Sequence, residues 1–417
     1  MKNRFGLVFS TLAAAALALT ACGTPTPTPT AVPPTEPAAE ATATTETMGT
    51  GAPLVGEVTL WHAYGTGSTE EKALTQVIDS IKANNPDLTI NALQIPFDQV
   101  FNKWETEVAA GECPDIFTAP NDNLGNQVRA GLVAPLGSFL EGKLDGFAPL
   151  AVEGVTVDGE IYAVPGIVKA VALYYNADTV TAVPTTTDEL LAAVKDGKKL
   201  VINQNGYHNF GFFGAFGGQL MDDNGACIAD QGGFAEAFQY LLDLKAAGAI
   251  FETDGGKADT LFKSGDADMI INGPWVLGDY QKEVKNLGVA PIPAGPDGNA
   301  ATPLTGIDGW YINPNGDDAQ QQLAADLALW VLSPENQAIY ADVAGAPPSA
   351  VGVKTANPLV TAFAEAGAAG FPRPQSAEFG NYWGPFGDAL TKVMEGKSSP
   401  EDAVTEACSA MNTANGK

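Results

Sequence analysis

Short apolar runs alternate with longer segments of helical periodicity from about residue 54 to the C-terminus. Val58–Trp61 is typical of a buried strand, and Ser68 with Glu71 is typical of a capping box that opens a helix, which Pro86 would stop. Strands and helices that alternate at this spacing favour a mostly parallel α/β sheet. Because the alternation resumes after residue 187, the pattern predicts two α/β lobes rather than one.

The remaining elements follow from the same periodicities and from helix-end residues. Phe234–Ala247 has apolar residues on one face and Gly248 as its stop, and Ser333 with Pro334 opens a late helix. Further strands are predicted at Leu88–Ile95, Asp115–Phe117, Leu200–Ile202 and Met269–Ile271, and further helices around Val100–Val108 and at Thr187–Val194, Ala319–Leu332 and Pro334–Val343.

The N-terminus has the features of an export signal rather than of a folded element. Lys2 and Arg4 precede the apolar run Phe5–Leu19, which is short for a membrane-spanning helix. Residues 24–53 consist mainly of Thr, Pro, Ala and Glu, a composition that stays extended and solvated. We therefore expect the folded body to begin near residue 54.

Charge and histidine content exclude several classes of function. The chain has 21 Lys and Arg against 49 Asp and Glu, a formal net charge of −28, which argues against nucleic acid as a partner. Only two histidines occur, His62 and His208, so a multi-His zinc site is excluded. No Cys/His spacing typical of a metal or redox site occurs, and no metal or cofactor is expected.

Three cysteines lie beyond the N-terminal segment, namely Cys113, Cys227 and Cys408. An exported protein can form disulfides, so that at most one bridge and one free thiol are expected. The spacing does not select the pair.

Aromatic residues recur in turns that are rich in Gly, Pro or Asn. Trp275 ends the turn Asn272–Trp275, which directly follows the strand Met269–Ile271, at the edge of an open α/β sheet where ligands gather. Rings interleaved with Asn, Asp and Gln suit a sugar, whose C–H faces lie on rings while its hydroxyls need hydrogen-bond partners. A Trp that packs under its own loop is the alternative for Trp275. For the aromatic residues that follow Tyr207 we prefer core packing; these are Phe210, Phe212, Phe213 and Phe216.

Ordered motifs along the body resemble the maltose-binding proteins, the solute receptors of ATP-driven importers. The segment Asp266–Trp275 is the most specific of them. The others are Ala110–Phe117, Ala130–Leu136, Leu173–Asp178, Gly217–Gly218 and Trp383–Leu390. Similarly, Leu19–Gly23 resembles the lipobox of bacterial lipoproteins, which implies that Cys22 is lipidated and tethers the mature protein to the extracytoplasmic face of the cell membrane, at the cell surface or in the periplasm.

The resemblance implies an α/β, two-lobed periplasmic-binding-protein-like fold, with a ligand cleft between lobes that several hinge crossings join. It implies these segments: 1–21 signal peptide, 22–53 lipid-anchored linker, 54–167 with 308–346 as lobe 1, and 168–307 with 347–417 as lobe 2.

Site residues are implied by position in the matching motifs. Tyr207, Trp275 and Trp383 match stacking rings, and Asp122 matches a carboxylate that bonds sugar hydroxyls. Tyr64, Asp308 and Trp310 complete the expected site, although hinge packing is an equal interpretation of Trp310. Lys169 stands where relatives carry a Glu, and it is expected to contact sugar hydroxyls, to neutralise Asp122, or to pair with an acidic group of the ligand. Other departures from the motif occur at Ala119, Asn123 and Asn205.

These features together predict a non-catalytic, monomeric receptor that captures maltose, a maltodextrin or a related α-glucoside by hinge closure and delivers it to the permease subunits of an ABC importer. One alternative is a receptor for an anionic sugar or a glycerol phosphodiester that binds through Lys169. The other is a secreted glycoside hydrolase, which would need two opposed carboxylates that no motif singles out.

Overall fold

The computed structural model describes residues 53–367 and 370–417. The predicted signal peptide, Cys22 and the linker up to residue 52 lie outside this range. Within the described residues, no helix is both long enough and apolar enough to cross a membrane.

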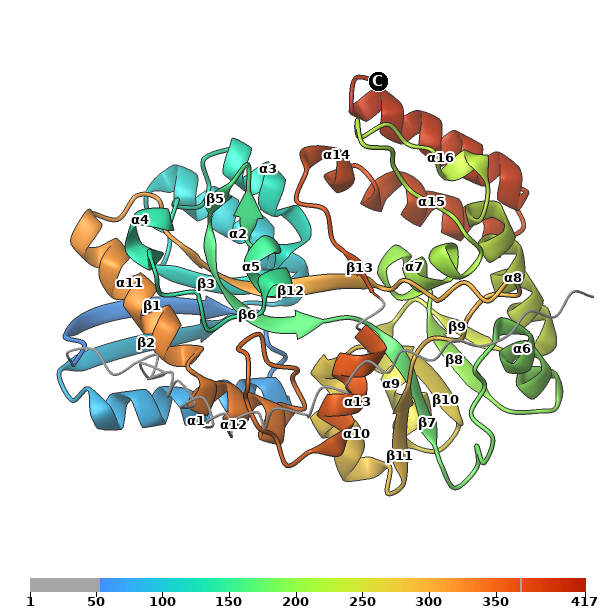
Figure 1. Ribbon diagram of the computed structural model, residues 1–417, viewed down its shortest axis with the longest axis horizontal. Coiled ribbons are helices and arrows are strands. Elements are labelled where there is room, and N and C mark those ends of the chain that lie inside the picture. Colours follow the sequence, from blue (N-terminus) through green and yellow to red (C-terminus); the bar gives the residue numbers. More distant parts are fainter. Residues whose placement is uncertain (1–52, 368–369) are drawn as a thin grey trace, which may run out of the picture. The chain divides into compact units, whose positions relative to one another are not determined.

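The described chain is built around two mixed sheets, each covered by helices (Figure 1). The first has the strand order β13-β12-β3-β1-β2, with β6 paired to β12, and the second has the order β11-β7-β10-β8-β9. The first sheet contains β1 (Gly56–His62), β2 (Leu88–Gln94), β3 (Ile116–Pro120), β6 (Ala163–Lys169), β12 (Leu304–Ile312) and β13 (Phe371–Pro372). The second contains β7 (Ala172–Asn176), β8 (Leu200–Asn203), β9 (Ile250–Glu252), β10 (Met269–Asn272) and β11 (Leu287–Ala290).

The expectation of mostly parallel sheets is only partly correct. β1 pairs in parallel with β2 and β3, and β8 pairs in parallel with β9 and β10. However, β12 runs antiparallel to β3 and β6, and β7 runs antiparallel to β10 and β11. β7 and β12 each follow a passage of the chain from one sheet to the other, and no helix lies between them and the preceding strand to indicate their direction.

Alternate residues of each strand face opposite layers of the core, as the pleat requires. In the first sheet, Ile116 belongs to the core beneath α1 (Thr69–Asn84) and α11 (Asp318–Val331), whereas Phe117 belongs to the core beneath α2 (Phe97–Ala110). The first lobe also contains β4 (Thr156–Val157), β5 (Glu160–Ile161), α3 (Leu124–Arg129), α4 (Gly137–Leu140), α5 (Pro149–Glu153) and α12 (Pro334–Ala344).

The second sheet is also buried on both faces. Ile271 faces the core that contains residues of α8 (Phe234–Ala247), and Ile270 faces the core that contains residues of α13 (Pro358–Gly367). The other helices of this lobe are α6 (Thr187–Lys195), α7 (Gly206–Ala215), α9 (Gly255–Lys263), α10 (Leu277–Glu283), α14 (Ala377–Gly380), α15 (Trp383–Met394) and α16 (Pro400–Ala414).

Helix ends form where the sequence predicts them. The Ser68 side chain accepts a hydrogen bond from the Glu71 amide, and the Ser333 side chain caps α12 with Pro334 in its first turn. Gly248 ends α8 in the left-handed conformation with φ of 115°, which a Cβ atom would disfavour.

A disulfide joins the α16 helix to the loop that follows α7. Cys227 and Cys408 are bridged, with their Cα atoms 5.4 Å apart, and Cys113 is a free thiol. The structure thus selects one of the three pairs that the sequence leaves open.

Candidate functional site

Three predicted rings come from three separate segments of the second lobe. Tyr207 lies in the first turn of α7, Trp275 in the short helix η3 (Pro274–Val276), and Trp383 at the start of α15. The ring centroids of Tyr207 and Trp275 are 6.0 Å apart, and all three side chains are partly exposed. Tyr207 and Trp383 are both in contact with the guanidinium group of Arg373, whose carbon lies 5.3 and 5.6 Å from their respective centroids.

The backbone around Trp275 is adapted to this ring. A Cβ atom on Gly273 would overlap the indole ring of Trp275, so a glycine is needed for the ring to fold back over the turn. The Gly273 carbonyl accepts a hydrogen bond of 2.8 Å from the Tyr174 hydroxyl, and its amide donates one of 2.8 Å to Asn272. The turn is therefore held in place from the core of its own lobe.

Asn205, a departure from the family motif, has a local structural role. Its side chain accepts hydrogen bonds from the amides of Tyr207 and His208 and caps α7. The His208 ring lies 5.8 Å from Trp275, and burial lowers its pKa to about 4, so that the imidazole is neutral near pH 7. Tyr207 is thus placed by a capped helix end and backed by a neutral ring.

Arg373 links the two lobes at this point. It directly follows β13, and its guanidinium pairs with Asp122 and donates a hydrogen bond of 3.1 Å to the Asn121 side chain, both in the first-lobe helix η1 (Asn121–Asn123). Gly306 provides the space, because a Cβ atom there would lie 2.9 Å from an Arg373 nitrogen. The same guanidinium therefore contacts first-lobe polar groups and second-lobe rings.

Lys169 is a second buried cation that lies between carboxylates and aromatic rings. Its ammonium nitrogen lies 2.9 Å from Glu70 and 2.8 Å from Asp308, and it faces the rings of Tyr64 and Trp275 at 5.7 and 5.8 Å. Burial disfavours the ammonium, but Asp308 and Glu70 outweigh this and raise the pKa of Lys169. Burial also raises the pKa of both carboxyl groups, against the opposing attraction of Lys169.

This arrangement corrects the expectation that Lys169 neutralises Asp122. Lys169 pairs with Glu70 and Asp308, and Asp122 pairs with Arg373 instead. The reason is topological: Lys169 ends β6 opposite Gly306 of β12, which places it next to Asp308 in that strand rather than next to η1.

Trp310 does not share the surroundings of the other predicted residues. It is 1% exposed and belongs to the first-lobe core, where it packs with Val164 and Ile312. The position of Trp310 is therefore explained by packing in the first-lobe core. Tyr64 is also buried, next to Tyr340 at 6.3 Å, but it retains its contact with Lys169.

The sequence interpretation misses three polar residues of this site, namely Arg373, Glu70 and Asn121. Glu70 is indistinguishable in sequence from an acidic residue that favours a helix N-terminus. Arg373 offers a clearer signal, because it is one of only three arginines in the chain and lies between two prolines, Pro372 and Pro374.

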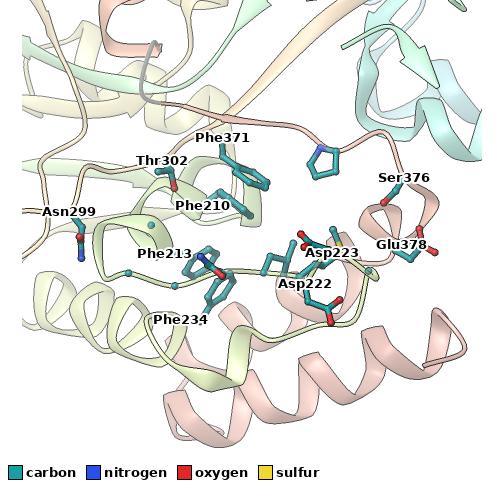
Figure 2. A pocket seen from close by; sticks show the side chains of 18 of the residues that line it. Phe210, Phe213, Asp222, Asp223, Phe234, Asn299, Thr302, Phe371, Ser376 and Glu378 are labelled. Atoms are coloured by element: carbon teal, nitrogen blue, oxygen red, sulfur yellow. The ribbon is translucent and has the colours of Figure 1, made fainter. Parts of the chain in front are cut away.

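A cavity of about 920 Å³ lies in the second lobe, and none of the eight predicted ligand-binding residues lines it (Figure 2). Its walls include Phe210, Phe213, Phe234 and Phe371, with Asp222, Asp223 and Glu378 gathered toward one end. The stacked rings of Phe210 and Phe371, 5.8 Å apart, form part of the wall. The predicted core positions of Phe210, Phe212 and Phe213 are confirmed by their burial, whereas Phe216 is only partly buried and packs against the same core. Across the described residues, no group of three or more His, Cys, Asp and Glu side chains is arranged to hold a metal ion.

Comparison with known proteins identifies relatives along most of the chain. The family model described as bacterial extracellular solute-binding protein matches residues 76–368. The maltodextrin-binding protein of Bacillus subtilis is 25% identical over 81% of this chain and 87% of its own length. The maltooligosaccharide ABC transporter solute-binding lipoprotein of Streptococcus pneumoniae is 23% identical over 82% of this chain and 89% of its own.

The fold agrees with solved structures. The maltose/maltodextrin-binding domain from Bdellovibrio bacteriovorus, bound to maltotriose, superposes with a TM-score of 0.79 at 25% identity and covers 87% of this chain and 100% of that domain. The expected two-lobed binding-protein fold is confirmed. Because the family model spans well over half of the chain, the protein belongs to the bacterial extracellular solute-binding protein family, whose members are receptors and not enzymes.

Proposed function

We propose that this protein captures a malto-oligosaccharide between its two lobes and delivers it to an ABC importer. The observation that carries the proposal is the set of buried polar atoms beside the rings of Tyr207, Trp275 and Trp383. Asp308 Oδ1, Arg373 Nε and Trp383 Nε1 are buried and have no hydrogen-bond partner within the described protein. Buried polar atoms without partners are costly, and sugar hydroxyls would supply both donors and acceptors.

The placement of these groups suits capture by closure. Asp122 and Asp308 extend from the first lobe and the rings from the second, so a sugar that contacts both sets would favour the closed form. Tyr64, Lys169 and Arg373 would complete the site, and Trp310 would support it from the core. The proposal keeps lobe limits near 167, 307 and 346, moved to the strand ends at Lys169 and Leu304, with β13 as a return to the first sheet. A monomeric state is also part of the proposal.

Relatives support the choice of ligand and partner. The Bacillus subtilis relative is a maltodextrin-binding protein, the Bdellovibrio domain was solved with maltotriose, and the Streptococcus pneumoniae relative is a lipoprotein of an ABC transporter. We therefore include anchoring through Cys22 at the extracytoplasmic face of the membrane in the proposal.

Calorimetric titration with glucose, maltose, maltotriose and maltotetraose tests the ligand class. We expect saturable binding of the oligosaccharides and a loss of at least about 30-fold in affinity for Trp275→Ala, the effect of removing a binding ring worth about 2 kcal/mol. Trp330→Ala is the matched control, because Trp330 is a half-buried indole on α11, on the core layer of the first lobe. Absence of binding to every oligosaccharide, or equal affinity in Trp275→Ala, would refute the proposal.

A further inference from the structure

The charged side chains around the rings differ in how far they are exposed to solvent. The two cations are buried, with side-chain exposures of 11% for Lys169 and 2% for Arg373, and each is already paired with a carboxylate. Glu70 and Asp308 are buried as well, at 8% and 2%, whereas the Asp122 side chain is 25% exposed. The accessible charge at the site is therefore negative.

The hydrogen bonding of Asp122 leaves capacity for a ligand. Its Oδ1 atom accepts from Arg373, and within residues 53–367 and 370–417 no side chain or amide donates to Oδ2. A carboxylate has lone pairs on both oxygens, so an incoming donor can bind without breaking the pair with Arg373. A positively charged donor would form a stronger, charge-assisted bond there than a hydroxyl group.

The surrounding charges reinforce this bias. Counted around the rings, the carboxylates of Asp122, Glu70 and Asp308 outnumber Lys169 and Arg373 by one. Asp279, behind Glu70, is balanced by Lys282 at 2.9 Å. Asp259 accepts hydrogen bonds of 2.6 Å from Tyr280 and 2.8 Å from Asn272, and it lies near Lys263. The net charge of −28 repels an anion further.

From this geometry we infer that the site selects its saccharide by charge: it binds an amine-bearing oligosaccharide through Asp122 more tightly than the neutral one, and it rejects acidic oligosaccharides. The inference rests on the proposed function and specifies its ligand class. It opposes the hypothesis that Lys169 recognises an anionic sugar or a phosphodiester, because the Lys169 ammonium group already forms ion pairs with Glu70 and Asp308.

Chain-matched maltotriose derivatives test the inference. The set consists of maltotriose and its derivatives in which one C6 position, in each of the three units in turn, carries a primary amine or a carboxylate. Calorimetry at pH 7 should show that at least one amine derivative binds about 10-fold more tightly than maltotriose, the usual advantage of a charge-assisted bond. Every carboxylate derivative should bind at least about 10-fold more weakly. The amine advantage should shrink as NaCl is raised, because added salt screens the partly exposed charge.

Two variants assign the effect to one carboxylate. Asp122→Asn keeps the shape of the side chain and should abolish the amine advantage. Asp223→Asn removes one negative charge from the wall of the 920 Å³ cavity, which none of the three rings lines, and should leave the order of affinities unchanged. A circular dichroism melt of each variant establishes that it is folded, and the salt dependence of the unmodified protein gives a readout that needs no variant.

The outcomes separate this inference from the proposed function. Binding of maltotriose without any amine advantage, binding of a carboxylate derivative as tight as that of maltotriose, or an advantage that persists in Asp122→Asn overturns the inference alone. A protein that binds neither maltotriose nor any derivative overturns the proposed function and the inference with it.

Discussion

Arg373 and Asp122 form an ion pair although 251 positions separate them in the chain. Asp122 lies in a short helix of the first lobe, and Arg373 lies in the segment that leads from β13 back to the second lobe. The amide of Arg373 also donates a hydrogen bond of 3.0 Å to the Thr305 carbonyl. One residue of a connecting segment is thus fixed to the first lobe through both its backbone and its side chain.

Breaking this pair should destabilise the protein. Arg373→Met keeps the aliphatic length of the side chain but removes its charge, so that Asp122 loses its cation and the Asn121 side chain loses a donor. Because Asp122 is only partly buried, we expect a decrease of about 1–3 kcal/mol in the free energy of unfolding, below the usual cost of breaking a fully buried pair. Urea denaturation measures this difference.

A double-mutant cycle is the control for this prediction. Arg373→Met should cost less in an Asp122→Asn background, because no uncompensated carboxylate is then left behind. An equal cost in both backgrounds would mean that the two side chains are not coupled and that the loss of stability comes from packing of the Arg373 stem.

Gly273→Ala should weaken sugar binding without unfolding the protein. The new Cβ atom would overlap the Trp275 indole, so that the ring has to leave the position in which it faces Lys169 and Tyr207. We expect affinity for maltotriose to fall about 10-fold, by calorimetry, together with a shift in tryptophan fluorescence. Gly387→Ala on α15 is the control, because its Cβ atom meets no atom within 4 Å. Unchanged affinity in Gly273→Ala would show that sugar binding does not depend on the position of the Trp275 ring.

Local signals predicted most of the regular elements, and long-range pairing explains what they did not predict. Phe234–Ala247 is a helix with the expected limits, because both its apolar face and its Gly248 stop are encoded within the segment itself. The partners of Lys169 depend instead on the register of β6 against β12, which no periodicity reveals. Arg373 is a similar case, because its role exists only once β13 has paired with β12.

Replacing Trp310 should affect stability rather than ligand affinity. The side chain is packed in the first-lobe core, where Gly166 lets the ring lie close to the β6 backbone. Trp310→Phe leaves a cavity in a well-packed layer, and we expect a loss of about 1–3 kcal/mol in urea denaturation with the maltotriose dissociation constant within about 2-fold of the original. A large loss of affinity with little loss of stability would contradict this prediction and indicate that Trp310 contacts the ligand.

The Cys227–Cys408 bridge should contribute substantially to the stability of the second lobe. It closes a separation of 181 residues, and a long loop loses much conformational freedom in the unfolded chain when it is cross-linked. Reduction with dithiothreitol, or the double substitution with Ala, should lower the free energy of unfolding by about 2–5 kcal/mol. Cys113→Ser should retain the full response to reductant, since Cys113 is the free thiol. A response that disappears in Cys113→Ser would contradict this pairing.

Acid should weaken the α7 end of the site through His208. Burial lowers the pKa of His208 from an ordinary value of 6.5 to about 4, so that the unfolded chain binds this proton more readily than the folded one. The free energy of unfolding therefore decreases as the pH falls from about 6.5 to about 4, by up to about 3 kcal/mol from this group. His62, whose pKa burial also lowers, acts in the same direction. The raised pKa values of Glu70 and Asp308 act in the opposite direction.

The contribution of His208 is isolated by comparison with His208→Gln, which retains a hydrogen-bonding side chain next to Asn205 and Asn272 but does not titrate. Stability measured by urea denaturation between pH 4 and 7 should decline less steeply in the variant, and the difference between the two curves should become independent of pH above about pH 7. Parallel curves across this range would show that the His208 proton is not linked to folding. Maltotriose affinity, in contrast, should change only as the pH approaches about 4, where the folded protein protonates the imidazole that lies beside the Trp275 and Tyr207 rings.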